Sequence, residues 1–571
     1  MLRTHTCGEL TKKDVRKKVT LSGWAHNIRR FGKKAFIDLR DRYGVTQLVL
    51  DEKFKDIYDS LTRESVLITS GKVTKRKDPN PEMATGEIEI VVDTLVVASK
   101  AEALPFEIFN PSVESTEETR LKYRYLDLRR SEMLRMLEFR FRVEMILRNY
   151  FQMKEFVEVE TPQLSKPTPE GARDFLIPSR VVKGKFWALP QSPQQYKQLM
   201  MVAGIDKYFQ IVKCFRDEDL RKDRQYEFTQ LDVEMSFVDE DDIMNLAEGA
   251  ISVLYSQLLG IKLKKPFLRL TWHDAMDKYG SDKPDLRFSL PIIDVTSDFE
   301  HSGLKIFEKV IEDGGVVRAI FTSELLKRSE IRELESIAKR HGFPGLAWIK
   351  NDDEVTGSIV SRLSEDLKKE FSKRKGTTLI VAGDWLKTVS AMGDIRLALG
   401  AKLGLRKGMS ILWVTEFPLF EWSETEKSAT PSHHPFTSPA KGYEDRLGEK
   451  ITKEDTLEIP ARAYDLVING TEIGGGSIRI TDRDFQEKMF ETLGIDKERA
   501  NEKFGMLLSA FRYGVPPHGG IAFGLDRLLQ VMLQTDSIRD VIAFPKSKSG
   551  KALMENAPSE ADKEALKELG L

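Results

Sequence analysis

The sequence contains almost no cysteine and no long apolar run, and these absences exclude several classes of protein. Only Cys7 and Cys214 occur in 571 residues, so neither a disulfide framework nor a cysteine-rich metal site is possible. Such a chain suits a reducing compartment, and we expect a cytoplasmic protein. No apolar run approaches the ~20 residues that span a bilayer, and the polar, basic residues 1–18 lack a signal-peptide core. The His-Glu-x-x-His pattern is also absent, so a dedicated zinc site is not expected.

The net charge is close to zero, but the charge is unevenly distributed. The chain has 89 basic and 90 acidic side chains, a net charge of −1, which gives no overall attraction to nucleic acid. Residues 1–45, however, hold 12 Lys or Arg against 4 Asp or Glu. A basic segment on a neutral protein predicts one docking surface for a polyanion. Apolar content of 40% and charged content of 31% are typical of a soluble globular protein, and the length suggests several domains.

Changes in residue pattern along the chain predict its organisation. Short alternating strands with one helical stretch at Phe54–Leu61 indicate a small barrel, and a proline-containing polar stretch then reads as a linker. A later region shows helices and strands without any chemical constellation, as in an inserted domain. The predicted segments are a barrel at 1–105, a linker at 106–125, the first part of a large domain at 126–287, an insert at 288–413 and the second part of that domain at 414–571.

The predicted barrel carries a basic stretch beside aromatic residues. We expect residues 27–34 to form a loop in which Arg29 and Arg30 lie close to Phe31 and Phe36. Cations and aromatic rings together favour binding of single-stranded nucleic acid, whose bases stack on the rings. A solvated basic loop beside a core aromatic is the alternative interpretation.

The stretch 214–232 is the most informative part of the chain. It places Arg216, Arg221 and Arg224 among five acidic residues, between two apolar runs that read as buried strands. Because buried charge is costly unless it is paired, arginines and acids on a loop between core strands suit a ligand that carries phosphate and metal. A solvated charged hairpin is the alternative. We call residues 216–227 the arginine loop.

Four further segments point to the same kind of site. Residues 165–174 form a predicted loop with Glu170, and residues 191–197 place amides and Lys197 at the start of a helix, where a small carboxylate would bind. Asp465 and Glu472 flank an apolar strand and could share a magnesium ion with substrate phosphates; glycines 474–476 after them would let a ligand approach or would form a flexible turn. In residues 519–527 a glycine-rich strand runs into a helix. Arg527 lies in the first turn of that helix, where its guanidinium could meet a phosphate.

Two adjacent histidines, His433 and His434, lie in a proline-flanked loop. Because neighbouring residues on a regular element point in different directions, we expect at most one of them to contact a ligand.

These motifs together resemble the class II aminoacyl-tRNA synthetases. Residues 519–527 are similar to motif 3 of that family, the arginine loop to motif 2, and the helix before Thr161-Pro162 to motif 1. Residues 170–174, 215–221, 280–287 and 538–545 resemble the bacterial-type aspartyl subgroup, and the similarity covers essentially the whole chain. The resemblance implies an α+β fold: an antiparallel sheet flanked by helices, an N-terminal OB-fold barrel that binds the anticodon, and an inserted α/β accessory domain. It also implies a homodimer.

The resemblance further implies a ligase that uses ATP, with Mg²⁺, to form aspartyl-adenylate and then charges tRNA-Asp. Arg216 and Arg527 would hold the α- and γ-phosphates and Glu218 the adenine or its ion, as the catalytic residues. The implied ATP site is Arg216, Asp217, Glu218, Gln225, Glu472, Gly524, Leu525, Asp526 and Arg527, and the implied metal ligands are Asp465 and Glu472. The implied aspartate site is Glu170, Ser192, Gln194, Lys197, Arg216, Asp232, His433 and Arg479.

In the barrel, Phe36 matches the base-stacking aromatic of the family, and Arg29 and Gln47 match its base-edge contacts. Phe31 departs from the family pattern at a position associated with whether tRNA-Asn is charged as well as tRNA-Asp, so both tRNA ranges stay open. A non-catalytic RNA-binding protein is a further alternative, although Arg216, Glu218 and Arg527 are all in place.

Overall fold

The computed structural model describes residues 2–109, 115–167, 171–448 and 451–571. The chain divides into two units, which are described separately. The first unit comprises Met1–Arg135 with Leu553–Glu555, and the second comprises Met136–Ala552 with Asn556–Leu571. The exact limits of the five predicted segments stay a prediction, and Glu170 lies outside the described residues.

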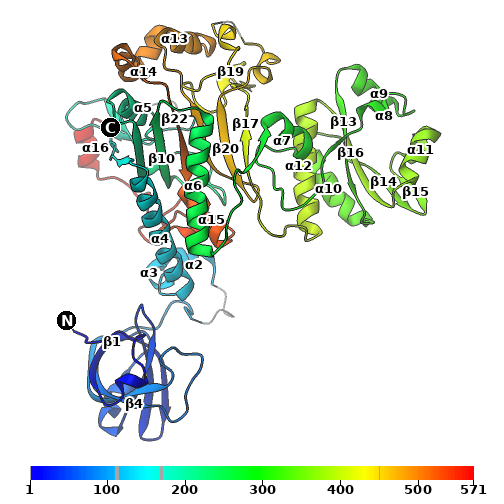
Figure 1. The fold of residues 1–571 in the computed structure, drawn as a ribbon. Coiled ribbons are helices and arrows are strands. Elements are labelled where there is room, and N and C mark those ends of the chain that lie inside the picture. Colours follow the sequence, from blue (N-terminus) through cyan, green and yellow to red (C-terminus); the bar gives the residue numbers. More distant parts are fainter. Residues whose placement is uncertain (1, 110–114, 168–170, 449–450) are drawn as a thin grey trace. The chain divides into compact units, whose positions relative to one another are not determined.

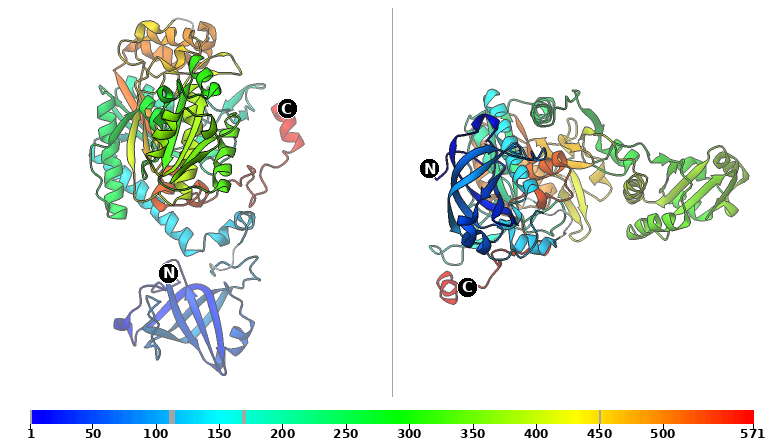
Figure 2. Two further views of the ribbon diagram at one scale, coloured as in Figure 1. Left: turned by 90° about the vertical axis from the view of Figure 1, so that its right-hand side faces the viewer. Right: turned by 90° about the horizontal axis from the view of Figure 1, so that it is seen from below.

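The first unit contains a closed barrel, coloured blue in Figures 1 and 2. Its interior is filled by alternating apolar side chains such as Leu21, Ile37 and Leu48, each fully buried. The helical stretch predicted at 54–61 is confirmed as α1. The barrel order is β1 (Lys18–Phe31), β2 (Lys34–Arg40), β3 (Val45–Leu50), β5 (Ile88–Ser99) and β4 (Val66–Lys75), with α1 (Lys55–Ser60) before β4 and the short helices α2 (Glu117–Lys122) and α3 (Arg124–Asp127) after β5.

The prediction of a loop over residues 27–34 is wrong. Strand β1 continues to Phe31 and pairs with β2 down to Phe31 opposite Lys34, which leaves only a tight turn at Gly32-Lys33. Gly32 has φ +55°, a left-handed conformation that glycine adopts without strain. Cross-strand pairing overrides the polar composition of the segment, so its cations lie on a rigid hairpin.

The second unit is built on an eight-stranded sheet (Figure 1). Its central strands run antiparallel, as expected, while the outermost pair at each edge is parallel. The order is β11 (Leu268–Thr271), β17 (Ile411–Thr415), β20 (Ala463–Ile468), β21 (Thr471–Ile478), β22 (His518–Gly524), β10 (Glu227–Ser236), β9 (Lys207–Phe215) and β6 (Val157–Glu158).

Helices flank this sheet and complete the predicted architecture. Helix α6 begins after Asp239, whose carboxylate caps the helix by accepting hydrogen bonds from the backbone N–H groups of Asp241 and Asp242. The helices of this part are α4 (Ser131–Met153), α5 (Gln194–Val202), α6 (Glu240–Leu259), α7 (Trp272–Tyr279), α13 (Arg483–Thr492), α14 (Lys497–Ala510), α15 (Leu525–Leu533) and α16 (Lys563–Leu569), and two small hairpins are β7 (Leu176–Pro178) with β8 (Phe186–Ala188) and β18 (Phe420–Ser423) with β19 (Ser428–Pro431).

The insert forms its own sheet with a core on each face (Figures 1 and 2). Ile320 packs against α10 and α12, whereas its neighbour Ala319 faces the opposite cluster with α9 and α11. The sheet is antiparallel throughout. Its strands are β12 (Ile293–Asp294), β13 (Val316–Thr322), β16 (Gly376–Gly383), β14 (Ala347–Asp352) and β15 (Glu354–Gly357), and its helices are α8 (Thr296–Phe299), α9 (Lys305–Glu312), α10 (Arg328–Arg340), α11 (Glu365–Ser372) and α12 (Trp385–Lys402).

No helix in the part of the chain that the structure describes is both long and apolar enough to cross a membrane.

Candidate active site

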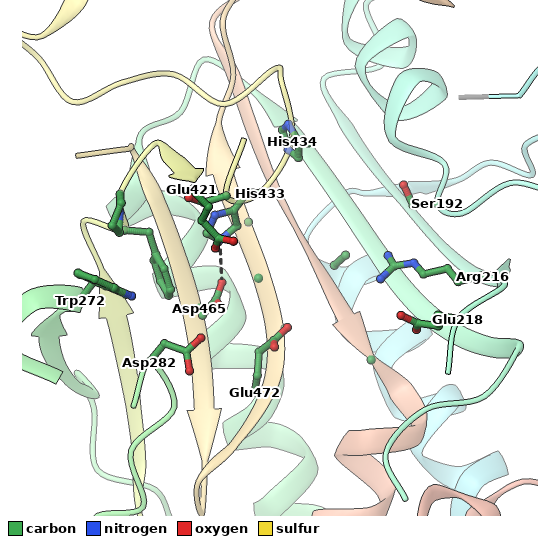
Figure 3. Close-up of a pocket in the computed structure, with 18 of the residues that line it drawn as sticks. Ser192, Arg216, Glu218, Trp272, Asp282, Glu421, His433, His434, Asp465 and Glu472 are labelled. Atoms are coloured by element: carbon green, nitrogen blue, oxygen red, sulfur yellow. Dashed lines mark hydrogen bonds and ion pairs between the residues drawn. The ribbon is translucent and has the colours of Figure 1, made fainter. Parts of the chain in front are cut away.

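A cleft of about 1440 Å³ lies in the second unit, and Figure 3 shows part of its lining. Strands β10, β20, β21 and β22 contribute residues to it, and so do the arginine loop and the loop that carries His433 and His434. Segments that are distant in the sequence therefore meet at one cavity. The predicted site residues that line it are Ser192, Gln194, Lys197, Arg216, Glu218, Gln225, Asp232, His433, Asp465, Glu472, Arg479, Gly524, Asp526 and Arg527.

Two predicted ATP-site residues lie elsewhere. Asp217 does not line the cleft; its backbone N–H donates to the Arg173 carbonyl at 3.0 Å, and its carboxylate lies 3.6 Å from the Arg173 guanidinium. Leu525 is fully buried in the core at the start of α15, so the helix uses its side chain as an anchor.

A buried group of four charges forms the floor of the cleft. Lys197 Nζ lies 3.0 Å from Asp232 Oδ1 and 3.5 Å from Glu234 Oε2. Arg479 donates from Nε and Nη2 to the two oxygens of Glu234, at 2.9 and 3.1 Å. Two cations thus balance two carboxylates where little solvent reaches, an arrangement that avoids the cost of unpaired buried charge.

Three buried polar atoms of the cleft lining make no hydrogen bond within the described part of the chain. Asp232 is fully buried, and its Oδ2 has no hydrogen-bond partner among the described residues; the same holds for Gln194 Nε2 and Arg216 Nε. Burial raises the pKa of Asp232 in spite of the nearby Lys197 ammonium. Because buried polar atoms are normally satisfied, these acceptor and donor atoms suit a polar ligand.

Two glycines make room for carboxylates of neighbouring strands. A Cβ on Gly520 would lie 1.9 Å from Glu234 Oε2, and one on Gly475 would lie 2.4 Å from Asp465 Oδ1. Any larger residue would displace these acids. Gly475 lies inside β21 rather than in a flexible turn, since the turn of this hairpin falls at Asn469-Gly470.

Asp465 and Glu472 lie on adjacent strands and both face the cleft (Figure 3). His433 Nε2 lies 3.3 Å from Asp465 Oδ1. In the described part of the chain, no cluster of three or more His, Cys, Asp or Glu is arranged to hold a metal ion. Two carboxylates fit Mg²⁺ nonetheless, because this ion usually takes one or two protein carboxylates and completes its shell with phosphate and water oxygens.

His433 and His434 both line the cleft (Figure 3), and the expectation that at most one of them contacts a ligand stays a prediction. They lie in an irregular turn, whose backbone can direct neighbouring side chains to the same cavity. His434 Nε2 contacts Arg479 Nη1, which also donates to Ser477 Oγ at 2.6 Å. Burial first, and then the Arg479 cation, lower the pKa of His434 well below its usual value, so a neutral ring accepts from the guanidinium.

Arg527 reaches the cleft from the first turn of α15. Its guanidinium lies 3.5 Å from Asp223 Oδ2 and 3.4 Å from Glu472 Oε2. The preceding Asp526 accepts from Arg140 Nη1 at 2.6 Å and from the Thr229 backbone N–H at 2.8 Å. Asp526 therefore fixes the start of the helix that carries Arg527.

Sequence reasoning missed several residues of this site. Glu234 holds Arg479 from below, and Asp282 and Glu421 line the cleft near Asp465 (Figure 3). The signal for Glu234 was present, because Asp232 and Glu234 share one face of an apolar strand where charge is unexpected. The insert also contributes to the lining, which no motif in the sequence indicated: His341, Asp384, Leu386, Lys387 and Ser390.

The predicted anticodon residues lie together on the barrel. Arg29 donates to both oxygens of Asp38 at 2.9 and 2.8 Å and to Gln47 Oε1 at 3.1 Å. The Phe36 ring lies beside the exposed Phe31, with centroids 6.0 Å apart. Gln47 is only 4% exposed, so it supports Arg29 from beneath.

Comparison with known proteins defines the class of this chain. Residues 116–548 match the family model for class II tRNA synthetases (D, K and N), and residues 19–98 match the OB-fold nucleic acid binding domain. Solved structures agree on the fold: asparaginyl-tRNA synthetase from Pyrococcus horikoshii has a TM-score of 0.60 at 19% identity and covers 96% of this chain and 99% of its own. A putative aspartyl-tRNA synthetase from Leishmania major also has a TM-score of 0.60, at 20% identity, over 95% and 94% of the two chains. The chain belongs to the class II tRNA synthetases of the D, K and N group.

Within that class, relatives that match over nearly their whole length are named as aspartate–tRNA ligases. The chain is 48% identical to the Aspartate–tRNA(Asp/Asn) ligase of Aquifex aeolicus, over 99% of this chain and 98% of that protein. It is 49% identical to the protein of the same name from Thermotoga maritima, over 100% and 99%. The Aspartate–tRNA ligase of Thermosipho africanus is 46% identical over 100% and 98%.

Proposed function

We propose that the cleft activates L-aspartate with ATP and transfers the aspartyl group to tRNA-Asp. In the first step an α-carboxylate oxygen of aspartate attacks the α-phosphorus of ATP, which gives aspartyl-adenylate and releases pyrophosphate. A terminal ribose hydroxyl of the tRNA then attacks the carbonyl carbon, and AMP leaves. The convergence of Arg216, Arg479 and Arg527 on one cleft supports this activity.

The nucleotide would lie along the arginine loop. Arg216 stacks over Phe228, with its guanidinium carbon 5.2 Å from the ring centroid, and this fixes the direction in which it meets an α-phosphate. Arg527 would take the γ-phosphate in exchange for its contacts with Asp223 and Glu472. Positioned cations that stabilise charge developing on phosphate oxygens are the main catalytic contribution that such a site can make.

Aspartate would bind by an exchange of partners on the cleft floor. Its ammonium group fits Asp232 Oδ2, and its side-chain carboxylate fits Lys197 and Arg479, while His433 and Ser192 would close the pocket. Asparagine would occupy Asp232 but offer Lys197 no anion. Sites built on such pairing reject an analogue that lacks the charged group by ~10⁴-fold or more.

Asp465 and Glu472 would hold Mg²⁺, with phosphate oxygens completing its shell. The ion would neutralise charge on the leaving pyrophosphate.

Aspartate-dependent exchange of radioactive pyrophosphate into ATP tests the first step. The proposal expects exchange with L-aspartate and little with L-asparagine or L-lysine. Absence of aspartate-dependent exchange in folded, Mg²⁺-supplied protein would refute it and favour an RNA-binding protein.

A second candidate is the wider tRNA range, in which tRNA-Asn is also aspartylated. It is favoured by the Asp/Asn names of relatives near 48% identity. Charging assays with purified tRNA-Asp and tRNA-Asn separate the two activities.

We also propose a cytoplasmic homodimer. The two cysteines are buried and form no disulfide, which suits a reducing compartment. Helix α4 exposes Phe141 (62%) and Met145 (40%), and the β7–β8 hairpin exposes Trp187 (47%). A second copy of the chain would cover these side chains. Light scattering on the purified protein measures the mass.

A further inference from the structure

The segment after α15, residues 537–547, lies against the arginine loop although more than three hundred residues separate the two in sequence. At the tip of the loop, the Lys222 carbonyl accepts from Ser537 Oγ at 2.9 Å and from the Ile538 backbone N–H at 3.0 Å. Arg539 Nη1 donates to the neighbouring Arg221 carbonyl at 3.3 Å. The tip is therefore fixed through its main chain, whatever its own side chains do.

The base of the loop is held by the same segment. The Lys546 backbone N–H donates to Gln225 Oε1 at 2.7 Å, and Gln225 Nε2 donates back to the Lys546 carbonyl at 3.3 Å. Lys546 Nζ pairs with Glu227 Oε1 at 2.7 Å. Gln225 is 1% exposed, so this reciprocal pair is shielded from water.

The segment has a firm support of its own. Ser537 and Val541 are 7% and 0% exposed, and the Val541 carbonyl accepts from Arg140 Nη1 at 3.3 Å. Arg140 also binds Asp526, next to Arg527. The segment, α4 and the start of α15 thus form one hydrogen-bonded base beneath the ATP side of the cleft.

A surface loop this rich in charge needs such a base. Its internal contacts include the Arg224–Glu218 ion pair at 2.8 Å, but these do not attach the loop to the core. When only a fraction of the molecules has the binding-competent loop, the apparent affinity for the ligand equals the intrinsic affinity multiplied by that fraction.

We infer that residues 537–547 are a clamp that holds the arginine loop in its ATP-binding conformation, with Ser537 and Lys546 as positioning residues. The inference rests on the proposed function, because it assigns ATP to Arg216 and Glu218. It explains why the 538–545 motif, which touches the cleft only through Ile538, lies where it does. The clamp acts on the nucleotide side, since the aspartate floor at Lys197 and Arg479 makes none of these contacts.

The test uses the full-length enzyme with Ser537→Ala and Lys546→Met, the conservative variants Ser537→Thr and Lys546→Arg, and the control Lys548→Met. Lys548 is an exposed lysine two residues from Lys546. Pyrophosphate exchange gives KM for ATP and for aspartate separately. We expect KM for ATP to rise about tenfold in the first two variants, partial or full rescue in the conservative ones, and no change in KM for aspartate or in the control.

Hydrogen exchange of residues 216–227 in the nucleotide-free variants gives a second readout, which should show faster exchange there and unchanged exchange in β9 and β10. An unchanged KM for ATP in both variants would overturn the clamp, as would a parallel rise in both KM values, which indicates general damage. A wild-type protein without aspartate-dependent exchange would instead refute the proposed function, and the hydrogen-exchange result would still test the clamp.

Discussion

Arg479 and Glu234 form a bidentate ion pair at the floor of the cleft, with N–O distances of 2.9 and 3.1 Å and side chains only 1% and 0% exposed. Burial alone would raise the pKa of Glu234, but the Arg479 guanidinium and the Lys197 ammonium outweigh it and hold the pKa below its usual value. Glu234 is therefore ionised near neutral pH. It orients the guanidinium of Arg479, which we propose binds the substrate carboxylate, and Gly520 leaves the space that this requires.

Replacing Lys197 or Arg479 by alanine should abolish most aspartate activation while leaving ATP binding nearly intact. Each change removes one partner of a buried charge pair, which costs about 2–5 kcal/mol, or roughly 30- to 4000-fold in kcat/KM for aspartate. KM for ATP should change by no more than about threefold, because the arginine loop is untouched. Lys207→Ala, at a more exposed lysine paired with Glu155, is the control. Near-normal aspartate kinetics in either variant would show that the pocket assignment is wrong.

Substituting the two carboxylates of β20 and β21 should change the response to magnesium. Asp465→Asn and Glu472→Gln each remove one negative oxygen ligand, so half-saturating Mg²⁺ in pyrophosphate exchange should rise and the maximal rate should fall. Asp465 sits in a space that Gly475 leaves open, so an asparagine of the same shape fits there. Glu424→Gln, at the rim of the cleft, should retain the wild-type Mg²⁺ curve. A normal Mg²⁺ dependence in both strand variants would contradict the metal assignment.

Local sequence rules predicted those elements of secondary structure that depend mainly on residues close together in the chain. The helical stretch at 54–61 was recognised because helical periodicity is a pattern of residues three and four positions apart. The prediction of a loop over residues 27–34 was wrong because the segment pairs with β2, and composition alone does not reveal contacts between strands. The exposure of Phe141 and Met145 on α4 could not be predicted, because periodicity shows that a helix face is apolar and not what covers it.

The candidate site also has parts that the local sequence predicted and parts that depend on tertiary contacts. The charged and glycine-rich motifs were found because each carries unusual residues over a short stretch. The clamp on the arginine loop was not, because it acts through main-chain groups of Arg221 and Lys222, and every residue has these. The insert's part in the cleft depends on tertiary packing alone.

The stability of the protein should fall on acidification partly through His434. Burial and Arg479 lower the pKa of His434 well below its usual 6.5, so the folded chain keeps it neutral while the unfolded chain binds a proton below that pH. The resulting loss of folding free energy is absent above pH 6.5. It grows as the pH falls below 6.5, by up to ~1.4 kcal/mol per pH unit. His434→Gln, whose amide oxygen can still accept from Arg479, should flatten the decline of the unfolding midpoint between pH 7 and pH 5. The exposed His301→Gln variant should follow wild type, and identical slopes in all three proteins would show that His434 does not titrate on unfolding.

Removing the stacking ring of the barrel should impair tRNA charging without affecting amino-acid activation. Phe36 lies on β2 beside Arg29, which Asp38 and Gln47 hold in place, so a base that stacks on the ring also meets an oriented guanidinium. Loss of one stacked base costs about 1–3 kcal/mol, so KM for tRNA should rise roughly 5- to 150-fold in Phe36→Ala. Aspartate-dependent pyrophosphate exchange takes place in the other unit and should keep its wild-type rate. Tyr43→Ala, which removes another exposed aromatic ring of the first unit, is the control and should charge tRNA normally. If the Tyr43 and Phe36 variants lose the same amount, the effect comes from general loss of aromatic surface, and the anticodon contact assigned to Phe36 is wrong.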